Sequence, residues 1–168
     1  MQDTGISQDA SRSGQYLSFR IGSDDYAVDI LRVQEIRGWE QVRDLPDSPD
    51  FVKGVLDMRG TIVPIIDLRI RFGDPQPQYL ATTVVIVVSV ERRDGHRQLV
   101  GTVVDSVSDV LDIDLSDMKA PPGIGREAAQ KYLQGMVSLE RGMVVLLDLD
   151  ILFGSIDLDQ VGDQGIVD

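Results

Sequence analysis

One triplet and one single residue could take part in catalysis, and neither has the partner groups that catalysis requires. Asp3-Thr4-Gly5 spells the triplet of an aspartic hydrolase. That chemistry needs two carboxylates sharing one proton in a sheltered site, whereas this triplet occurs once, in a polar segment. His96 is the single histidine, and the chain has no cysteine with which it could form a nucleophile–base pair or a metal site. We assign no catalytic residue and no metal ligand, and predict that the protein is not an enzyme.

Two further motifs have suitable residue types in an unsuitable context. The segment GIGRE at 123–127 looks like part of a dinucleotide-binding loop, but it follows a Pro-Pro dipeptide and lacks the third glycine. Asp112, Asp114 and Asp117 lack the glycine and the distal glutamate of a calcium loop. We expect a connecting loop and solvated carboxylates at these places, and no cofactor.

Composition narrows the class of partner. The 168-residue chain has a net charge of −12, and aromatic residues make up only 5% of it. Nucleic-acid binding depends on clustered Lys and Arg and on aromatic stacking, so a nucleic-acid partner is disfavoured. The first fifteen residues are polar, and no stretch reaches the roughly 18 apolar residues that a membrane helix needs. We expect a cytoplasmic protein without direct membrane insertion.

The elements that would position any site are mainly strands. Residues 16–21 alternate between apolar and polar, residues 82–90 are almost continuously β-branched, and residues 99–113 read as a returning strand. Asp94-Gly95 between the last two predicts a hairpin turn. Only short helices are predicted, at 67–72 and 148–153, each opening on an aspartate as N-cap.

The chain repeats itself. Residues 54–73 match residues 135–154: each has Arg-Gly at a turn, a short apolar strand, and then Asp-Leu-x-Ile-x-Phe-Gly. This similarity predicts that Gly60 and Gly142 occupy equivalent turns and that Arg141 is the counterpart of Arg59. Pro64 cannot donate to a ladder, so we expect an edge strand or a bulge there.

A weaker similarity links residues 27–36 to residues 101–110. It aligns four pairs: Ile30 with Val104, Val33 with Val107, Glu35 with Asp109, and Ile36 with Val110.

Together the repeats predict a mainly β fold of two related lobes, at roughly 15–80 and 81–154. Each lobe would have about five strands, the size of a small closed barrel. A single β-sandwich is the alternative. We expect residues 1–14 to form a disordered tail and the acidic residues 155–168 to be flexible.

Four segments in the same order, 16–38, 51–73, 83–88 and 100–111, resemble the CheW family. The most specific parts are VQEIRG and the pattern RG-x-x-VPI-x-DLR. The similarity covers about residues 15–154. It implies two SH3-like five-stranded β-barrel lobes with short helices, packed over a shared apolar seam.

The resemblance also implies a function. Members of the CheW family are non-catalytic chemotaxis adaptors that couple the cytoplasmic tip of methyl-accepting chemoreceptors to the regulatory domain of the CheA histidine kinase. They bind no cofactor and alternate with the kinase in rings, where other CheW copies are also candidate partners. They are cytoplasmic and recruited to membrane-associated arrays. A paralogue that serves another chemosensory pathway, controlling pili or a second messenger, is the alternative.

Carried over by position, the resemblance places receptor and kinase coupling on nine residues. These are Ile30, Val33, Glu35, Gly54, Arg59, Thr83, Val84, Val85 and Gly101. It implies that Glu35 and Arg59 form a charge pair, and that residues 83–85 and Gly101 line a groove for the receptor.

Each assignment has a purely structural alternative. The apolar positions could be core residues, because their periodicity is that of buried strands. The glycines could serve turns or bulges. Sequence pattern by itself does not separate these readings from the functional ones.

Overall fold

A computed structural model describes residues 13–120, 132–154 and 156. Its ten strands are β1 (Ser13–Ile21), β2 (Asp24–Asp29), β3 (Val33–Gly38), β4 (Val52–Met58), β5 (Thr61–Asp67), β6 (Val84–Glu91), β7 (Arg97–Val104), β8 (Ser106–Asp114), β9 (Leu133–Leu139) and β10 (Gly142–Leu147). The short helices are η1 (Ile30–Arg32), α2 (Leu68–Arg71), η2 (Leu115–Asp117) and α3 (Leu149–Gly154). Most of the expected tails lies outside the described residues, but Ser13 and Gly14, which we assigned to the N-terminal tail, begin β1.

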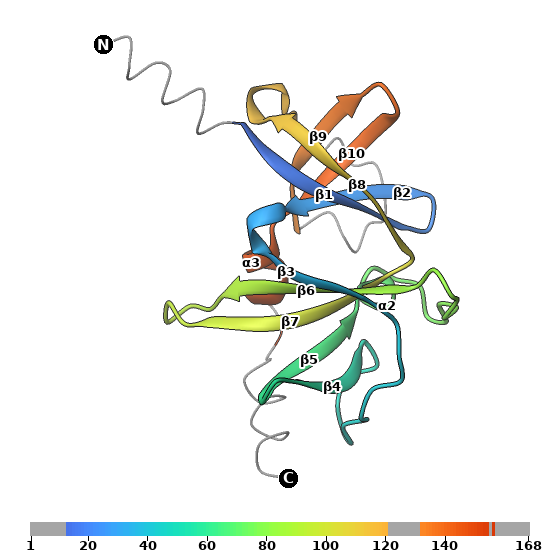
Figure 1. Cartoon of the computed structure of the whole chain (residues 1–168). Coiled ribbons are helices and arrows are strands. Elements are labelled where there is room, and N and C mark those ends of the chain that lie inside the picture. Colours follow the sequence, from blue (N-terminus) through green and yellow to red (C-terminus); the bar gives the residue numbers. More distant parts are fainter. Residues whose placement is uncertain (1–12, 121–131, 155, 157–168) are drawn as a thin grey trace.

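The strands form two five-stranded sheets, one above the other in Figure 1. The lower sheet, in the order β3-β6-β7-β5-β4, is built from one continuous segment, 33–104, and we call it the central lobe. The upper sheet, in the order β8-β1-β2-β10-β9, is built from the segments before and after it, and we call it the flanking lobe. Two lobes are thus present, but the expected division at residue 80 does not describe them.

The reason is an exchange of strands between the two sequence repeats. The predicted strand 99–113 is two strands, β7 and β8, which meet at Asp105 and lie in different lobes. In the first repeat, η1 separates β2 from β3 in the same way. Each repeat therefore begins in one lobe and continues in the other, and η1 and Asp105 are the two crossovers.

The strong repeat forms the same unit twice: β4, β5 and α2 match β9, β10 and α3. Asp67 caps α2, where its carboxylate accepts a hydrogen bond from the Arg69 amide at 3.0 Å. The predicted equivalence of Gly60 with Gly142, and of Arg59 with Arg141, was wrong by one residue. Arg59 and Gly60 are the turn residues of the first hairpin, both at positive φ, whereas Gly142 already belongs to β10 and pairs with Leu139.

Pro64 does not lie in an edge strand, because β5 runs between β7 and β4. Its partner in β4 is Val55, whose amide and carbonyl bond to Arg43 on the opposite side. Pairing of β5 with β7 starts only at Ile65. Proline is tolerated here because neither neighbouring strand requires its missing N–H.

The lobes are curled sheets rather than barrels closed by a full ladder. In the described part of the chain, the edge strands of each sheet are connected only through an isolated antiparallel bridge. Arg43 bridges to Val55 in the central lobe, and Lys119 bridges to Met136 in the flanking lobe. The expected SH3-like lobes are present, with closure reduced to one bridge in each.

The described residues form three apolar clusters. One lies inside each lobe: Val63, Ile65 and Val87 belong to the central cluster, while Tyr16, Ala27 and Leu146 belong to the flanking cluster. The largest cluster, which we call the seam core, lies between the lobes and receives side chains from both sheets and both α-helices. The shared apolar seam implied by the family resemblance is present.

Candidate protein-interaction surface

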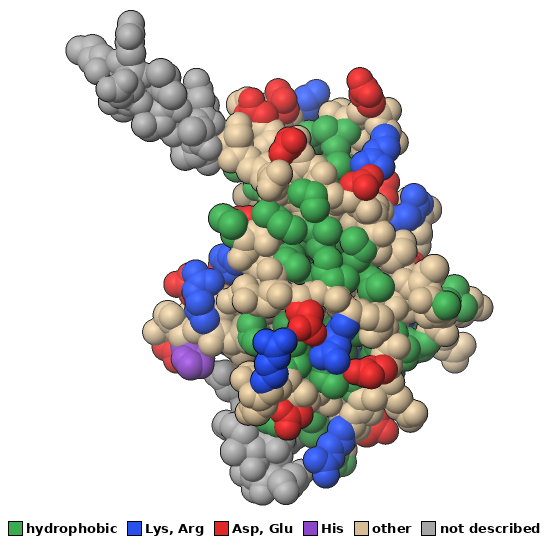
Figure 2. Space-filling model, in the orientation of Figure 1, with side chains coloured by type: hydrophobic (Ala, Val, Ile, Leu, Met, Phe, Trp, Pro, Cys, Tyr) green, Lys and Arg blue, Asp and Glu red, His purple; other side chains and the backbone are tan. Residues whose placement is uncertain are grey.

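Apolar side chains of the seam core continue to the surface on two edge strands, β3 and β8. Val33 and Val107 are partly buried against the seam core, while Ile36 and Val110 are 44% and 50% exposed. Figure 2 shows hydrophobic side chains gathered across the middle of this face, where the two lobes meet. We call the set the seam patch; its members are Val33, Ile36, Val107 and Val110, with Ile30 and Val84, which also pack against the seam core.

Strand register explains why these side chains share one face. Directly opposed residues of an antiparallel pair project to the same side of the sheet. In the flanking lobe, Val107 is opposite Phe19 and Val110 is opposite Leu17. In the central lobe, Ile36 is opposite Ile86. Phe19, Leu17 and Ile86 all belong to the seam core, so both edge strands extend that core to the solvent.

Three of the predicted coupling residues, Ile30, Val33 and Val84, belong to the seam patch. The patch residues that the prediction omitted are Ile36, Val107 and Val110. The weak repeat contained a signal for them, because it aligned Val33 with Val107 and Ile36 with Val110. What it did not reveal was that β3 and β8 are edge strands of different lobes.

The expected charge pair between Glu35 and Arg59 is absent from this structure. Glu35 is opposite Val87, so it projects from the other face of β3, and it pairs with Arg37 at 3.3 Å. Arg59 is exposed at the β4–β5 turn and makes no ion pair with the residues that the structure describes. In the other repeat, Arg141 of the β9–β10 turn contacts Asp109 of β8 at 2.5 Å.

Three other predicted residues lie in the interior. Thr83 is 1% exposed, and its hydroxyl accepts a hydrogen bond from the Leu80 amide at 2.8 Å. Val85 is buried in the central-lobe cluster. A Cβ on Gly101 would lie 2.4 Å from Cδ1 of Ile65 and 3.0 Å from Cγ1 of Val85. Thr83, Val85 and Gly101 therefore support the central lobe from inside and do not form its surface.

Gly54 is required by the bridge that connects the edges of the central lobe. Its φ is 147°, and a Cβ there would lie only 2.0 Å from the carbonyl oxygen of Arg43. Gly135 is its counterpart in the repeat and lies against the second bridge in the same way. A Cβ there would lie 2.9 Å from the carbonyl oxygen of Lys119. Both glycines allow close approach of a crossing backbone.

An ion pair that the sequence did not predict fixes the crossover at η1. The Arg32 guanidinium donates two hydrogen bonds to the Asp150 carboxylate of α3, at 2.8 and 2.7 Å. Asp150 also accepts from the Glu91 amide at 2.9 Å. The hydrogen bonds from Arg32 hold the pKa of Asp150 below its usual range. This bidentate pair fastens the crossover to the second helix.

The crossover at Asp105 is fixed by an ion pair in which the roles are reversed: the aspartate lies on the crossover and the arginine on the helix. Arg69 of α2, which aligns with Asp150 in the repeat, contacts Asp105 at 3.0 Å and the buried Asp67 at 2.9 Å. Tyr79 donates a hydrogen bond to Asp67 at 2.6 Å. Burial, together with this bond to Asp67, raises the pKa of the Tyr79 hydroxyl. Both crossovers are therefore held by an arginine–aspartate pair, which keeps the two halves of the seam patch in register.

The described residues offer little that resembles an active site. They contain no group of three or more His, Cys, Asp and Glu side chains placed to hold a metal ion. His96 is exposed in the β6–β7 turn, where its amide donates to Asp94 at 2.8 Å. Within the same residues, no helix has the length and apolar character needed to cross a membrane.

Comparison with known proteins finds relatives over most of the chain. The family model described as a CheW-like domain matches residues 15–157. The chain is 43% identical over 141 residues to the chemotaxis protein CheW of Klebsiella aerogenes, covering 84% of this chain and 82% of that one. It is 34% identical over 139 residues to the probable chemotaxis protein CheW of Rhizobium etli, covering 83% and 86%. The crystal structure of the scaffolding protein TtCheW from Thermoanaerobacter tengcongensis is similar with a TM-score of 0.72 and 28% identity, covering 83% of this chain and 92% of that one.

Proposed function

The chain belongs to the CheW family, and from this premise we propose that it is a non-catalytic chemotaxis adaptor that couples methyl-accepting chemoreceptors to the CheA histidine kinase. The observation that carries the proposal is the seam patch, an apolar surface built jointly by two lobes. The adaptor acts in the cytoplasm and is recruited to receptor arrays at the membrane.

We assign the receptor to the seam patch. The tip of a chemoreceptor is a helical hairpin, and an amphipathic helix binds by laying its apolar face on an apolar surface. Ile36 and Val110 are the exposed members of the patch, while Val33 and Val107 continue it into the seam core. A helix lying across the patch would contact both lobes, so the arginine–aspartate pairs at the crossovers would hold the two halves of its binding surface in place.

Charged residues of the central lobe would set the orientation of the partners. Glu35 and Arg37 lie on the other face of β3, and Arg59 lies at the β4–β5 turn. Exposed charges contribute little to folding but influence association rate and register. We assign Arg59 to partner contact on this basis. The regulatory domain of the kinase and further CheW copies are the partners that the remaining surface would serve in rings.

The test is binding of the full chain to a receptor cytoplasmic fragment and to the kinase, measured by pull-down and by titration calorimetry. Ile36→Asp and Val110→Asp should each weaken receptor binding at least roughly 10-fold, because a charge would be desolvated in the contact. Met143→Asp is the matched control, since Met143 is 46% exposed but lies on β10, outside the seam patch.

Two results would contradict the proposal. Failure of the unmodified chain to bind either partner would exclude the adaptor function. If Met143→Asp weakened receptor binding as much as Ile36→Asp while the melting temperatures of both variants stayed normal, the receptor would not bind at the seam patch.

A further inference from the structure

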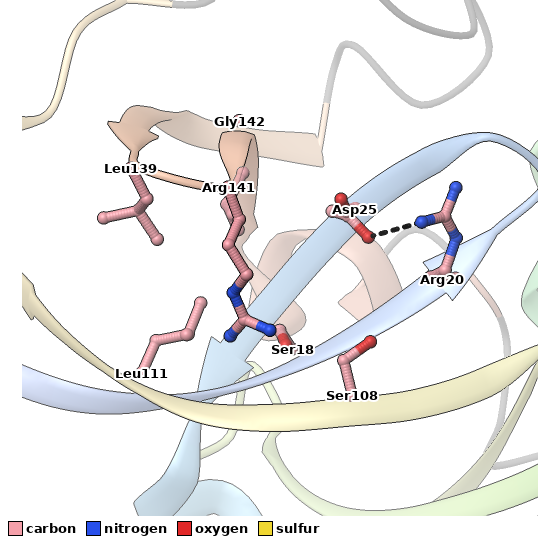
Figure 3. Close-up of a pocket in the computed structure, with 9 residues that line it drawn as sticks. Ser18, Arg20, Asp25, Ser108, Leu111, Leu139, Arg141 and Gly142 are labelled. Atoms are coloured by element: carbon pink, nitrogen blue, oxygen red, sulfur yellow. Dashed lines mark ion pairs between the residues drawn. The ribbon is translucent and has the colours of Figure 1, made fainter.

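A second surface feature lies on the side of the flanking lobe that faces away from the seam. It is a hollow of about 210 Å³ between the middle of β1, the middle of β8 and the β9–β10 turn. Leu111 and Leu139 form one wall, and Ser18 and Ser108 lie opposite. Figure 3 shows the Arg141 side chain reaching between these two walls.

The hollow has the size and polarity for one amphipathic side chain. Small-molecule sites in proteins measure about 300–1,000 Å³, so this hollow is too small for a cofactor. Leu111 and Leu139 are partly buried members of the flanking-lobe cluster, and they supply an aliphatic wall. Arg141 supplies a planar pair of donors suited to a carboxylate. Ser108 adds a hydroxyl that has no hydrogen-bond partner among the described residues.

The surrounding charges limit the charge that a ligand of the hollow can carry. Two arginines border the hollow, and each is paired with an aspartate: Arg20 contacts Asp25 at 3.6 Å, and Arg141 contacts Asp109 at 2.5 Å. The local net charge is therefore zero. A carboxylate that displaces one aspartate from its arginine leaves one uncompensated negative charge, whereas a dianionic phosphate group would leave two on an already acidic protein.

Arg141 is held in place by a pair that is easily exchanged. The Ser18 hydroxyl both donates to the carbonyl and accepts from the amide of Asp109, at 3.1 Å each, where β1 and β8 shift register. These bonds fix the backbone of Asp109, while the side chains of Asp109 and Arg141 are 52% and 65% exposed. An exposed pair contributes only about 0–1 kcal/mol. A carboxylate whose aliphatic neighbour packs against Leu111 and Leu139 also gains apolar burial, and this gain lets it compete with Asp109 for the same guanidinium.

We propose that this hollow binds the carboxylate of a partner protein's glutamate or aspartate that is flanked by an aliphatic residue, and that Arg141 transfers from Asp109 to that carboxylate. The site is independent of the seam patch. Along β1, Leu17 and Phe19 face the seam core, whereas Ser18 and Arg20 face the hollow. A partner could therefore occupy the hollow while another occupies the seam patch.

The test uses the full chain, labelled with ¹⁵N, and two blocked tripeptides, acetyl-Leu-Glu-Leu-amide and acetyl-Leu-Gln-Leu-amide. The glutamate peptide should shift the amide signals of Ser108, Arg141 and Gly142, and should bind roughly 5-fold or more tightly than the glutamine peptide. Arg141→Gln should remove this preference. Arg93→Gln, at the exposed β6–β7 turn of the other lobe, should leave it unchanged.

Asp109→Asn is the decisive variant, because it removes the competitor of the incoming carboxylate. It should tighten binding of the glutamate peptide by roughly 2- to 5-fold. If Asp109→Asn weakened binding, the pair would be part of the binding surface rather than its competitor, and the transfer of Arg141 would be wrong. Equal binding of the two peptides, or no binding of either, would overturn the site altogether.

Discussion

Replacing Gly54 by alanine separates a structural role of this predicted coupling residue from a direct one. The new Cβ would lie 2.0 Å from the carbonyl oxygen of Arg43 and 2.7 Å from its carbonyl carbon. Both are backbone atoms, so no side-chain rotation relieves the clash. The bridge between Arg43 and Val55 must open for alanine to fit.

The size of the effect follows from two contributions. Holding alanine at a φ of 147° costs about 1–2 kcal/mol. Opening the bridge loses two backbone hydrogen bonds, of 3.3 and 2.9 Å, each worth about 0.5–1.5 kcal/mol. The free energy of unfolding should therefore fall by roughly 2–5 kcal/mol. At about 2–4 °C per kcal/mol for a domain of this size, the melting temperature should fall by roughly 5–20 °C.

The assay is differential scanning calorimetry, with Gly60→Ala as the matched control in the same hairpin. Gly60 also has a positive φ, 89°, but a Cβ there would meet nothing within 4 Å. Gly60→Ala should therefore show only the conformational cost, and Gly54→Ala should lose clearly more stability. If the two variants melted within a degree or two of each other, the bridge would not be the reason for glycine at position 54. Loss of coupling in Gly54→Ala would then indicate contact with a partner.

Three further predictions concern charged and buried polar side chains. Arg59→Ala should change the free energy of unfolding by no more than about 0.5 kcal/mol yet weaken receptor coupling, and a melting temperature lowered by many degrees would make Arg59 structural. The lowered pKa of Asp150 means that its pair with Arg32 stabilises the fold above the unfolded pKa of about 4 and ceases to do so as pH falls through the folded pKa. Asp150→Asn should therefore cost about 1 kcal/mol at pH 7, and its stability should converge with that of the unmodified chain as pH falls through the lowered folded pKa; an unchanged difference at low pH would refute the linkage. Tyr79→Phe should lower the free energy of unfolding by about 1–2 kcal/mol, because the buried Asp67 loses a partly buried hydrogen bond, and an unchanged denaturation midpoint would refute this.

Local features of the sequence predicted local structure well. The β-branched run became β6, Asp94-Gly95 became the turn before β7, and Asp67 became the cap of α2. These outcomes depend on residues close in the chain, where side-chain periodicity and turn chemistry act directly. The alignment of Arg59 with Arg141 was wrong by one residue: the ungapped match of residues 54–73 with 135–154 places Glu140 opposite Arg59, and the strand pairing has this same register.

The candidate site depended on contacts between distant segments. The sequence was compatible with two roles for Ile30 and Val33, as core residues or as partner contacts, and did not distinguish between them. Their partial burial follows from their place at the crossover, since Ile30 lies in η1 and Val33 begins the edge strand β3. In the same way, Arg32 gave no signal because its partner Asp150 is far along the chain.

What the sequence determined by itself is the mainly β class, the duplicated strand–strand–helix unit and the family. It could do so because these are carried by spacing within short segments. Only the tertiary structure decided that the chain crosses between the lobes at η1 and Asp105, that Glu35 pairs with Arg37 rather than Arg59, and that the seam core reaches the solvent. The physical reason is that strand exchange and side-chain pairing are set by which surfaces bury each other, and two repeats with the same order of elements leave that choice open.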